Sequence, residues 1–173
     1  MLFPDVTAAA SRLCLACGMC CNGVLFHIVR LQQVDSVKRL ESLGLKINRK
    51  KKEPYFNQPC RFLEDCTCQI YNDRPSRCRL FECQQIKKLS SEETSENQAL
   101  EIIALAKSKV ARVEHLLHEC GNETHGRPLL ERCQEGVTKT GGVAKRELCE
   151  AAQELHDFLN VHFRIEPTEL TLG

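Results

Sequence analysis

The chain has 173 residues, and its 24 Lys and Arg nearly balance its 23 Asp and Glu. This length fits one domain of ordinary size or a small domain with a helical appendage, and two unequal parts suit the composition better. Cysteine accounts for 12 residues and Trp for none, so apolar packing is scarce and a bound metal is expected to add stability. The sequence has no secretory signal pattern and no run of about eighteen apolar residues. We therefore expect a cytoplasmic protein without a membrane span.

The small net charge conceals a difference between the two halves of the chain. Residues 1–89 carry 15 Lys and Arg against 8 Asp and Glu, whereas residues 90–173 carry 9 against 15. A basic half can indicate nucleic acid, but its basic residues are not interleaved with aromatic ones. A group of thiolates also brings negative charge that Arg and Lys would balance. The pattern therefore disfavours a nucleic-acid partner.

The first elements expected along the chain are short. An apolar, β-branched run predicts a strand at residues 24–29. Val34, Val37 and Leu40 recur at helical spacing and predict a helix over residues 31–43, which Gly44 would end in a left-handed conformation.

The next segment is expected to be irregular. Residues 60–71 are predicted to form two short extended arms around an acidic turn. A helix then starts at residues 72–75, because Pro75 suits a first helical position. Cys78 would lie in its first turns, and this helix is expected to end before Cys83.

From Ser90 onward the pattern becomes helical. Ser90 and Glu93 predict a capping box, which opens a helix that runs to about His118. Its expected apolar face consists of Leu100, Ile103, Ala106, Val110, Val113 and Leu117. Residues 119–142 are rich in glycine and are expected to form a linker, followed by a last helix over residues 143–163. The side chains expected to face inward from this helix are Leu148, Ala152, Leu155, Phe158 and Leu159.

These elements predict an α+β chain with two parts. Residues 11–89 would form a small, irregular, cysteine-rich metal-binding domain, and residues 90–173 a mainly helical C-terminal region. The amphipathic helices of that region are expected to cover the metal domain, to dimerise or to bind a protein partner.

The cysteines carry the chemistry of the first part, since nine of the twelve lie between Cys14 and Cys83. Thiolates two residues apart can ligate one zinc ion or one iron–sulfur cluster. In a reducing cytosol such cysteines stay free to bind metal, whereas in a secreted chain they would indicate disulfides. Both zinc and iron fit the thiols, and the Cys14, Cys17 and Cys20 spacing matches that of ferredoxin-type clusters.

The neighbouring cysteines Cys20 and Cys21 cannot easily reach one tetrahedral ion together, so they are expected to serve two metals or two edges of a cluster. Two interleaved four-thiolate sites would result if all of the following cysteines ligate: Cys14, Cys17, Cys20, Cys21, Cys60, Cys68, Cys78 and Cys83. Cys66 is left over, and it would either replace a neighbouring ligand or be an ordinary thiol near the site. The sequence does not show which cysteines share a metal.

These motifs resemble a known family. The run Cys14-x2-Cys17-Gly18-x-Cys20-Cys21 is followed by Pro59-Cys60-x-Phe62-Leu63, by Cys68-x-Ile70-Tyr71-x3-Pro75-x2-Cys78-Arg79 and by Cys83. Together they resemble the YkgJ-type CxxCxxCC family of zinc- or iron-chelating domains over roughly residues 11–89. The resemblance implies that the eight cysteines named above are the ligands, and it leaves Cys66 outside the pattern. A related cluster in flagellin lysine methylases implies iron–sulfur chemistry there.

Other candidate residues are weaker. A separate metal site at the end of a helix could use His115, His118, Cys120 and His125, although histidines also suit the dipole of a helix C-terminus. Cys133 and Cys149 fit small buried hydrophobes or exposed thiols better than ligands. Three arginines could donate hydrogen bonds to thiolate sulfurs: Arg74, Arg77 and Arg79.

The predicted function is the binding of zinc or iron through clustered cysteine thiolates, with an iron–sulfur cluster as one form of the iron. The metal-binding domain would then be a structural or redox module. The alternative is an iron–sulfur or zinc-dependent enzyme that modifies proteins, or a maturation factor. No nucleotide-binding loop and no nucleophile elbow is present in the sequence. The sequence names no catalytic residue.

Overall fold

The computed structural model describes residues 4–172, and the side chains from residue 8 onward. This part of the chain forms two compact units. We call residues 18–81 the cysteine unit, and residues 4–17 together with residues 82–172 the helical unit. The short antiparallel strands and the helices confirm the predicted α+β class.

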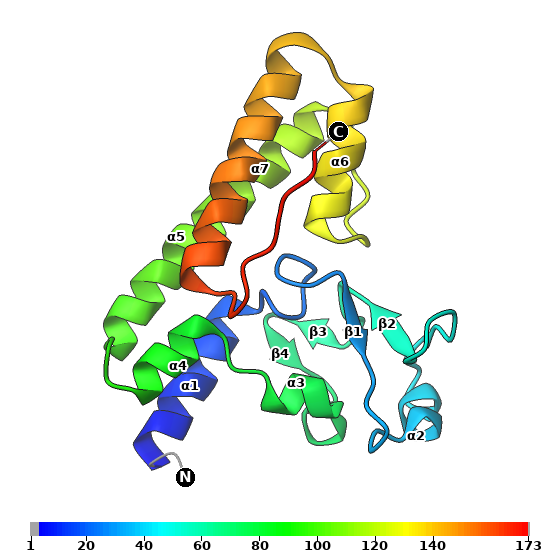
Figure 1. Cartoon of the computed structure of the whole chain (residues 1–173), viewed down its shortest axis with the longest axis vertical. Coiled ribbons are helices and arrows are strands. Elements are labelled where there is room, and N and C mark those ends of the chain that lie inside the picture. The colour runs from blue at the N-terminus through cyan, green and yellow to red at the C-terminus, as the bar shows by residue number, and fades with distance from the viewer. Residues whose placement is uncertain (1–3, 173) are drawn as a thin grey trace. The chain divides into compact units, whose positions relative to one another are not determined.

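The cysteine unit contains two small antiparallel sheets of two strands each, together with short helices (Figure 1). Its elements are β1 (Ile28–Arg30), α2 (Val37–Ser42), β2 (Tyr55–Asn57), β3 (Leu63–Glu64), β4 (Thr67–Cys68), the 3₁₀ turn η1 (Tyr71–Asp73) and α3 (Ser76–Leu80). Strand β1 pairs with β2 and strand β3 with β4. The buried core of this unit is small and consists of Val29, Leu31, Leu40, Leu45 and Phe56.

Several predicted elements of the cysteine unit are confirmed. The two arms of residues 60–71 are strands β3 and β4, and the helix that carries Cys78 ends at Leu80. Gly44 adopts a φ of +102°, as a left-handed residue after a helix does.

The predicted helix over residues 31–43 is too long. Helix α2 begins at Val37, because the Ser36 side chain caps it by accepting a hydrogen bond from the backbone N–H of Arg39. Val34 is 82 % exposed and contributes nothing to an apolar face. The predicted strand at residues 24–29 is shifted, since β1 begins only at Ile28.

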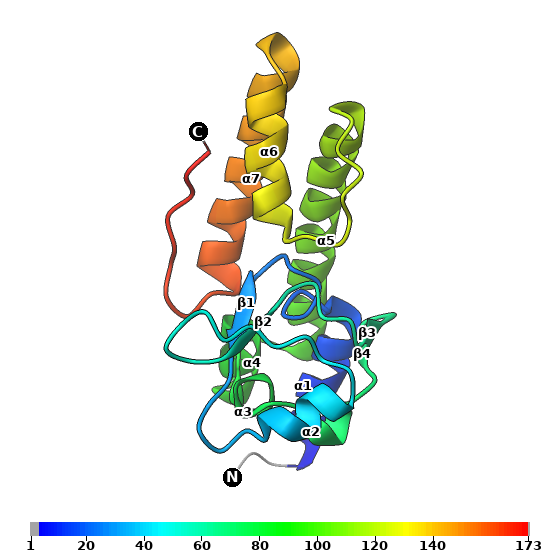
Figure 2. The ribbon, with the colours of Figure 1, turned by 90° about the vertical axis from the view of Figure 1, so that its right-hand side faces the viewer.

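The helical unit is built around one long helix. Its elements are α1 (Pro4–Cys17), α4 (Gln84–Ser90), α5 (Glu96–Glu119), α6 (Leu129–Lys139) and α7 (Gly142–His162). Helix α5 packs against each of the other four, and its buried face includes Ala99, Ile103, Ala106, Val113 and Leu117. Figure 2 shows α5, α6 and α7 side by side.

Three sequence predictions in the helical unit need correction. The capping box lies at Ser95 and Gln98 instead of Ser90 and Glu93. Helix α1 was not predicted at all. Residues 119–142 are not a linker throughout, because they contain helix α6.

Helix α6 tolerates a central glycine for a packing reason. A Cβ atom added at Gly136 would lie 2.9 Å from Cδ2 of Leu148 and 3.0 Å from Cδ2 of Leu117. The missing side chain therefore lets α6 approach both α7 and α5 closely. The last predicted helix is confirmed as α7, with Leu148, Ala152, Leu155 and Leu159 buried.

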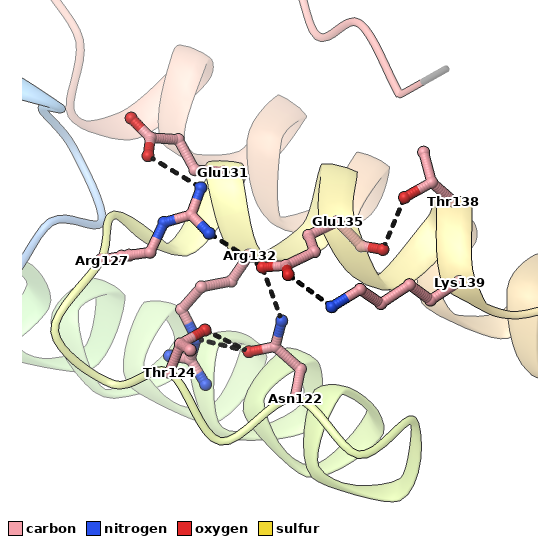
Figure 3. A network of polar contacts seen from close by, with 8 residues as sticks. All are labelled: Asn122, Thr124, Arg127, Glu131, Arg132, Glu135, Thr138 and Lys139. Atoms are coloured by element: carbon pink, nitrogen blue, oxygen red, sulfur yellow. Dashed lines mark hydrogen bonds and ion pairs between the residues drawn. The ribbon is translucent and has the colours of Figure 1, made fainter.

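A polar network fixes the loop between α5 and α6 (Figure 3). The carboxylate of Glu135 accepts hydrogen bonds from Arg127 at 2.9 Å, from Lys139 at 2.6 Å and from Asn122 at 3.4 Å. The Asn122 side-chain oxygen in turn accepts hydrogen bonds from Thr124 and from the buried Arg132. These contacts join the loop to α6 and order a segment that is rich in polar residues.

Candidate metal site

The first cysteine loop is a tight turn that begins where helix α1 ends, at Cys17. The carbonyl of Gly18 accepts hydrogen bonds from the backbone N–H groups of Cys21 at 3.0 Å and Asn22 at 3.1 Å. Gly18 has a φ of +67°, in the region that favours glycine. This turn places Cys20 and Cys21 at adjacent positions of one bend.

A second segment is hydrogen-bonded directly to that loop. The backbone N–H of Cys60 donates to the carbonyl of Cys21 at 2.7 Å, and the side-chain amide of Gln58 donates to the carbonyl of Cys20 at 3.2 Å. The backbone N–H of Gln58 also binds the carbonyl of His27 at 2.9 Å. Gln58 is 2 % exposed, so these bonds join two distant segments of sequence in the interior of the unit.

The hairpin β3–β4 positions Cys68. Cys68 pairs with Leu63 across the hairpin, and the N–H of Leu63 donates to the carbonyl of Cys60 at 3.1 Å. The backbone between Cys60 and Cys68 is thus folded back on itself, which brings the two cysteines to the same part of the unit.

Helix α3 positions Cys78, and Asp35 holds the start of this helix. One carboxylate oxygen of Asp35 accepts hydrogen bonds from the N–H and the hydroxyl of Ser76, at 2.8 Å and 2.7 Å. The other accepts one from the N–H of Gln32 at 2.7 Å. An acceptor at a helix N-terminus satisfies a backbone donor that has no partner within the helix. The sequence gave no sign of this role, because Asp35 was expected inside a helix.

Four thiols lie close enough to influence one another electrostatically. The pKa of Cys78 is raised to about 12, first by burial and then by the nearby thiols of Cys21, Cys60 and Cys68, whereas the charge of Arg74 acts to lower it. Burial likewise raises the pKa of Cys60, with a hydrogen bond from the backbone of Phe62 acting in the opposite direction and Cys68 adding to the rise. We call Cys21, Cys60, Cys68 and Cys78 the four-thiol group.

The four-thiol group borders the hydrophobic core of the cysteine unit. Cys60 and Cys78 both pack against the core cluster that contains Phe56 and Leu40. An apolar border limits the access of water to the sulfur atoms, and this strengthens any electrostatic attraction that they exert on a cation.

Cys66 also lies beside the first cysteine loop. A Cβ atom added at Gly18 would lie 2.8 Å from the Sγ atom of Cys66. Cys66 itself has a φ of +63° in the β3–β4 turn, which is costly for a residue other than glycine. The sequence did not decide whether Cys66 is a ligand. The structure places its sulfur atom next to Gly18, in the middle of the cysteine motif.

The remaining predicted ligands are distributed between the two units. Cys20 lies in the first cysteine loop of the cysteine unit. Cys14 and Cys17 lie on the last turn of α1, and Cys83 is the N-cap residue of α4, all three in the helical unit. Burial raises the pKa of Cys83, and hydrogen bonds from the backbone N–H groups at the start of α4 lower it.

The histidines proposed for a separate metal site are placed differently. His115 lies 3.6 Å from Glu119 and His118 lies 4.0 Å from Glu123. Cys120 ends helix α5, where its N–H donates to the carbonyl of Leu116, and His125 lies in the following loop. The two histidines of the helix therefore lie near carboxylates at the exposed surface of α5.

The arginines expected near the thiols have several partners. Arg74 stacks on the ring of Tyr71 at 3.5 Å and donates to its carbonyl at 2.9 Å, and its charge acts on Cys78. Arg77 lies 3.9 Å from Glu53. The charge of Arg79 acts on Asp35. Arg74 is thus the arginine whose position suits it to tune a thiol.

The donor set fits zinc or iron in its chemistry. Thiolates are soft ligands that bind both metals, and four of them complete a tetrahedral site. Within residues 4–172, no three or more His, Cys, Asp or Glu side chains already form an arrangement that would hold an ion. Binding would therefore require the partly exposed thiol side chains of the four-thiol group to move closer together.

Comparison with known proteins supports metal binding by this chain. The family model described as "CxxCxxCC: Putative zinc- or iron-chelating domain" matches residues 13–101, about half of the chain. No curated protein and no solved structure matches the sequence. In the described part of the chain, none of the helices is both long enough and apolar enough to cross a membrane. On the strength of the family match, the chain belongs to the CxxCxxCC family.

Proposed function

We propose that this protein binds zinc or iron through cysteine thiolates, and that Cys21, Cys60, Cys68 and Cys78 form one set of four ligands. The observation that carries the proposal is the place of Cys78. Its partly exposed thiol lies within electrostatic reach of three other thiols that come from three separate segments of the cysteine unit. Proximity contributes little stabilisation when four thiols are uncharged. Four thiolates around a cation, in contrast, are strongly stabilised by electrostatic attraction to it.

The other ligands of this proposal come from sequence spacing. Cys14, Cys17, Cys20 and Cys83 stay ligands predicted from sequence alone, because the neighbouring residues Cys20 and Cys21 are best divided between two sets of ligands. The metal-binding region of the proposal is the predicted domain at residues 11–89, and the helical region at residues 90–173 is its appendage. A protein partner for that appendage stays a prediction.

The main role of the metal in this proposal is structural. The strands of the cysteine unit have only two or three residues each, and its buried apolar core is small. A structural zinc site contributes about 10–16 kcal/mol in small metal-dependent domains. A reducing compartment such as the cytoplasm keeps the thiols available for this role.

The test is metal content per chain, measured by elemental analysis on protein purified without oxygen, with a visible absorption spectrum of the same sample. Colourless protein with zinc supports structural thiolate sites. Brown protein that contains iron and sulfide supports an iron–sulfur cluster. Protein that holds neither metal after expression with both supplied would overturn the proposal.

Two variants show which thiols are ligands. Cys78→Ser should lower the metal content by one ion per chain, and Cys120→Ser, at a partly exposed thiol of the helical unit, should leave it unchanged. Since Cys78→Ser could also unfold the cysteine unit, cobalt(II) titration of the wild-type protein provides a second measurement. Four thiolates around cobalt give intense sulfur-to-metal charge-transfer absorption, and its absence would contradict the four-thiol group.

A further inference from the structure

Two cysteines of the helical unit lie outside the residues matched by the family. Cys133 is on α6 and Cys149 is on α7, and these helices are joined by a short turn around Gly141. Helices with so short a connection run antiparallel. Cys133 lies eight residues before Gly141 and Cys149 eight residues after it, so both cysteines come to the same level of the hairpin.

The two helices are packed closely at that level. Gly136 lies about one turn beyond Cys133 on α6, and Leu148 directly precedes Cys149 on α7. A Cβ atom added at Gly136 would meet the Leu148 side chain at 2.9 Å. Figure 1 shows α6 alongside α7. Because α6 and α7 pack against each other and the Leu148 side chain reaches Gly136, side chains of ordinary length near this level can reach the opposite helix.

The two thiols differ in exposure, and Cys149 lies close enough to Cys133 to act on it electrostatically. Cys133 is 2 % exposed, whereas Cys149 is partly exposed, and both thiols are free. The pKa of Cys133 is raised to about 12, chiefly by burial; the charge of Arg132 acts to lower it and the neighbouring thiol of Cys149 to raise it. One thiol is thus open to a reagent and the other is close behind it.

We propose that Cys133 and Cys149 form a redox pair, which a low-molecular-weight disulfide oxidises to an intramolecular disulfide between α6 and α7. This reaction is independent of the proposed metal site. The partly exposed Cys149 is the attacking residue and the buried Cys133 is the resolving residue.

The reaction proceeds by two exchanges. The Cys149 thiolate attacks one sulfur of the reagent, a mixed disulfide forms, and the first reagent thiolate leaves. The sulfur of Cys133, after loss of its proton, then attacks the Cys149 sulfur, and the second reagent thiolate leaves. Two protein thiols are oxidised, one reagent disulfide is reduced to two thiols, and the two protein protons end on the reagent thiols.

The expected consequence is a hairpin that opens less readily. A bond between residues 133 and 149 closes a short loop and restricts the unfolded chain, which raises the melting temperature of the helical unit. Reduction of the bond by a small thiol would reverse the change. The pair would therefore make the stability of this unit depend on the surrounding thiol–disulfide balance.

The test uses the reduced, metal-loaded full chain and oxidised glutathione as the probe. After brief exposure, remaining thiols are alkylated and the protein is digested with trypsin. The expected product is a linked pair of peptides, residues 133–139 and 147–164, whose mass is two hydrogen atoms below the sum of the free peptides. Cys120→Ala should give the same linked pair, since it removes a thiol of similar exposure elsewhere in the unit.

Two further variants assign the roles. Cys133→Ala should retain glutathione on Cys149, because the resolving thiol is missing. Cys149→Ala should leave Cys133 unmodified until the protein is unfolded. The proposal is overturned if wild-type protein retains glutathione on Cys149 without the linked pair, if neither cysteine reacts, or if the linked pair appears only after denaturation.

Discussion

The two units of this protein are held together in different ways. The helical unit has helices of 24 and 21 residues with a continuous apolar core, so packing alone accounts for its order. The cysteine unit has no helix longer than six residues within residues 18–81, and its strands are shorter still. The difference indicates that the helical unit can fold without metal, whereas the cysteine unit depends on its thiols for stability.

The largest expected effect that separates the units is metal removal. A chelator should unfold the cysteine unit, because the proposed ligands contribute on the order of 10 kcal/mol, and should leave the helical unit folded. Hydrogen exchange followed by mass spectrometry would show this as a loss of protection in residues 18–81. Protection in α5 and α7 should persist, and its parallel loss would show that the two units depend on the same source of stability.

The converse experiment weakens the helical unit alone. Leu117 is fully buried between helices of this unit, and Leu117→Ala should lower the free energy of unfolding by about 2–5 kcal/mol through the cavity it leaves. Metal content measured on the same sample should not change. The matched control is Leu105→Ala, at a side chain that is 53 % exposed, and it should have little effect on unfolding. A lower metal content in Leu117→Ala would contradict the separation of the units.

A smaller effect is expected at Gly18, inside the cysteine motif. Gly18→Ala should lower the free energy of unfolding of the cysteine unit by about 1–2 kcal/mol, because alanine disfavours a positive φ. The new Cβ would also meet the Sγ atom of Cys66 at 2.8 Å. Denaturant unfolding of the metal-loaded protein measures the change.

The double variant Gly18→Ala with Cys66→Gly distinguishes the two causes. Glycine at position 66 suits the positive φ of that residue and removes the clash, so the double variant should recover part of the lost stability. If Cys66→Gly alone lowers the metal content, Cys66 is a ligand, and the eight-cysteine set implied by the family resemblance is incomplete.

The sequence predicted those features that depend on local patterns. The extended arms of residues 60–71, the end of the Cys78 helix and the helix over residues 143–163 were all predicted, because turn residues and apolar spacing determine them locally. The set of thiol ligands stays a prediction. The backbone hydrogen bond between Cys60 and Cys21 was not predicted, because it joins segments that are distant in the sequence.

The failures have the same explanation. Helix α6 was mistaken for part of a linker because glycine ordinarily weakens a helix, and only the close approach of Leu148 and Leu117 shows why Gly136 is suitable there. Asp35 and Gln58 were not predicted as positioning residues, because their hydrogen-bond partners lie far along the chain. Tertiary contacts that join remote segments leave no periodic signal in a single sequence.

The smallest effect is expected at Asp35, which links the loop before α2 to the helix of Cys78. Burial would raise the pKa of Asp35, but hydrogen bonds from Gln32 and Ser76 and the charge of Arg79 hold it below 3.8. A carboxylate with a lowered pKa stabilises the fold above pH 3.8 and loses this effect as the pH falls through the folded-state value. Asp35→Asn should therefore cost about 1 kcal/mol in the free energy of unfolding at neutral pH, a low figure because Asp35 is only half-buried.

Denaturant unfolding measures the difference in the free energy of unfolding between metal-loaded wild type and variant. The comparison runs from about pH 7.5 to about pH 6, where thiolate ligands retain their metal. The difference should stay constant over that range, since Asp35 is ionised throughout. A difference that shrinks as the pH falls within the range would show that another group, and not the Asp35 carboxylate, holds the start of α3. A constant difference would support the ionised Asp35 carboxylate as the contact that holds the start of α3, the helix that carries Cys78.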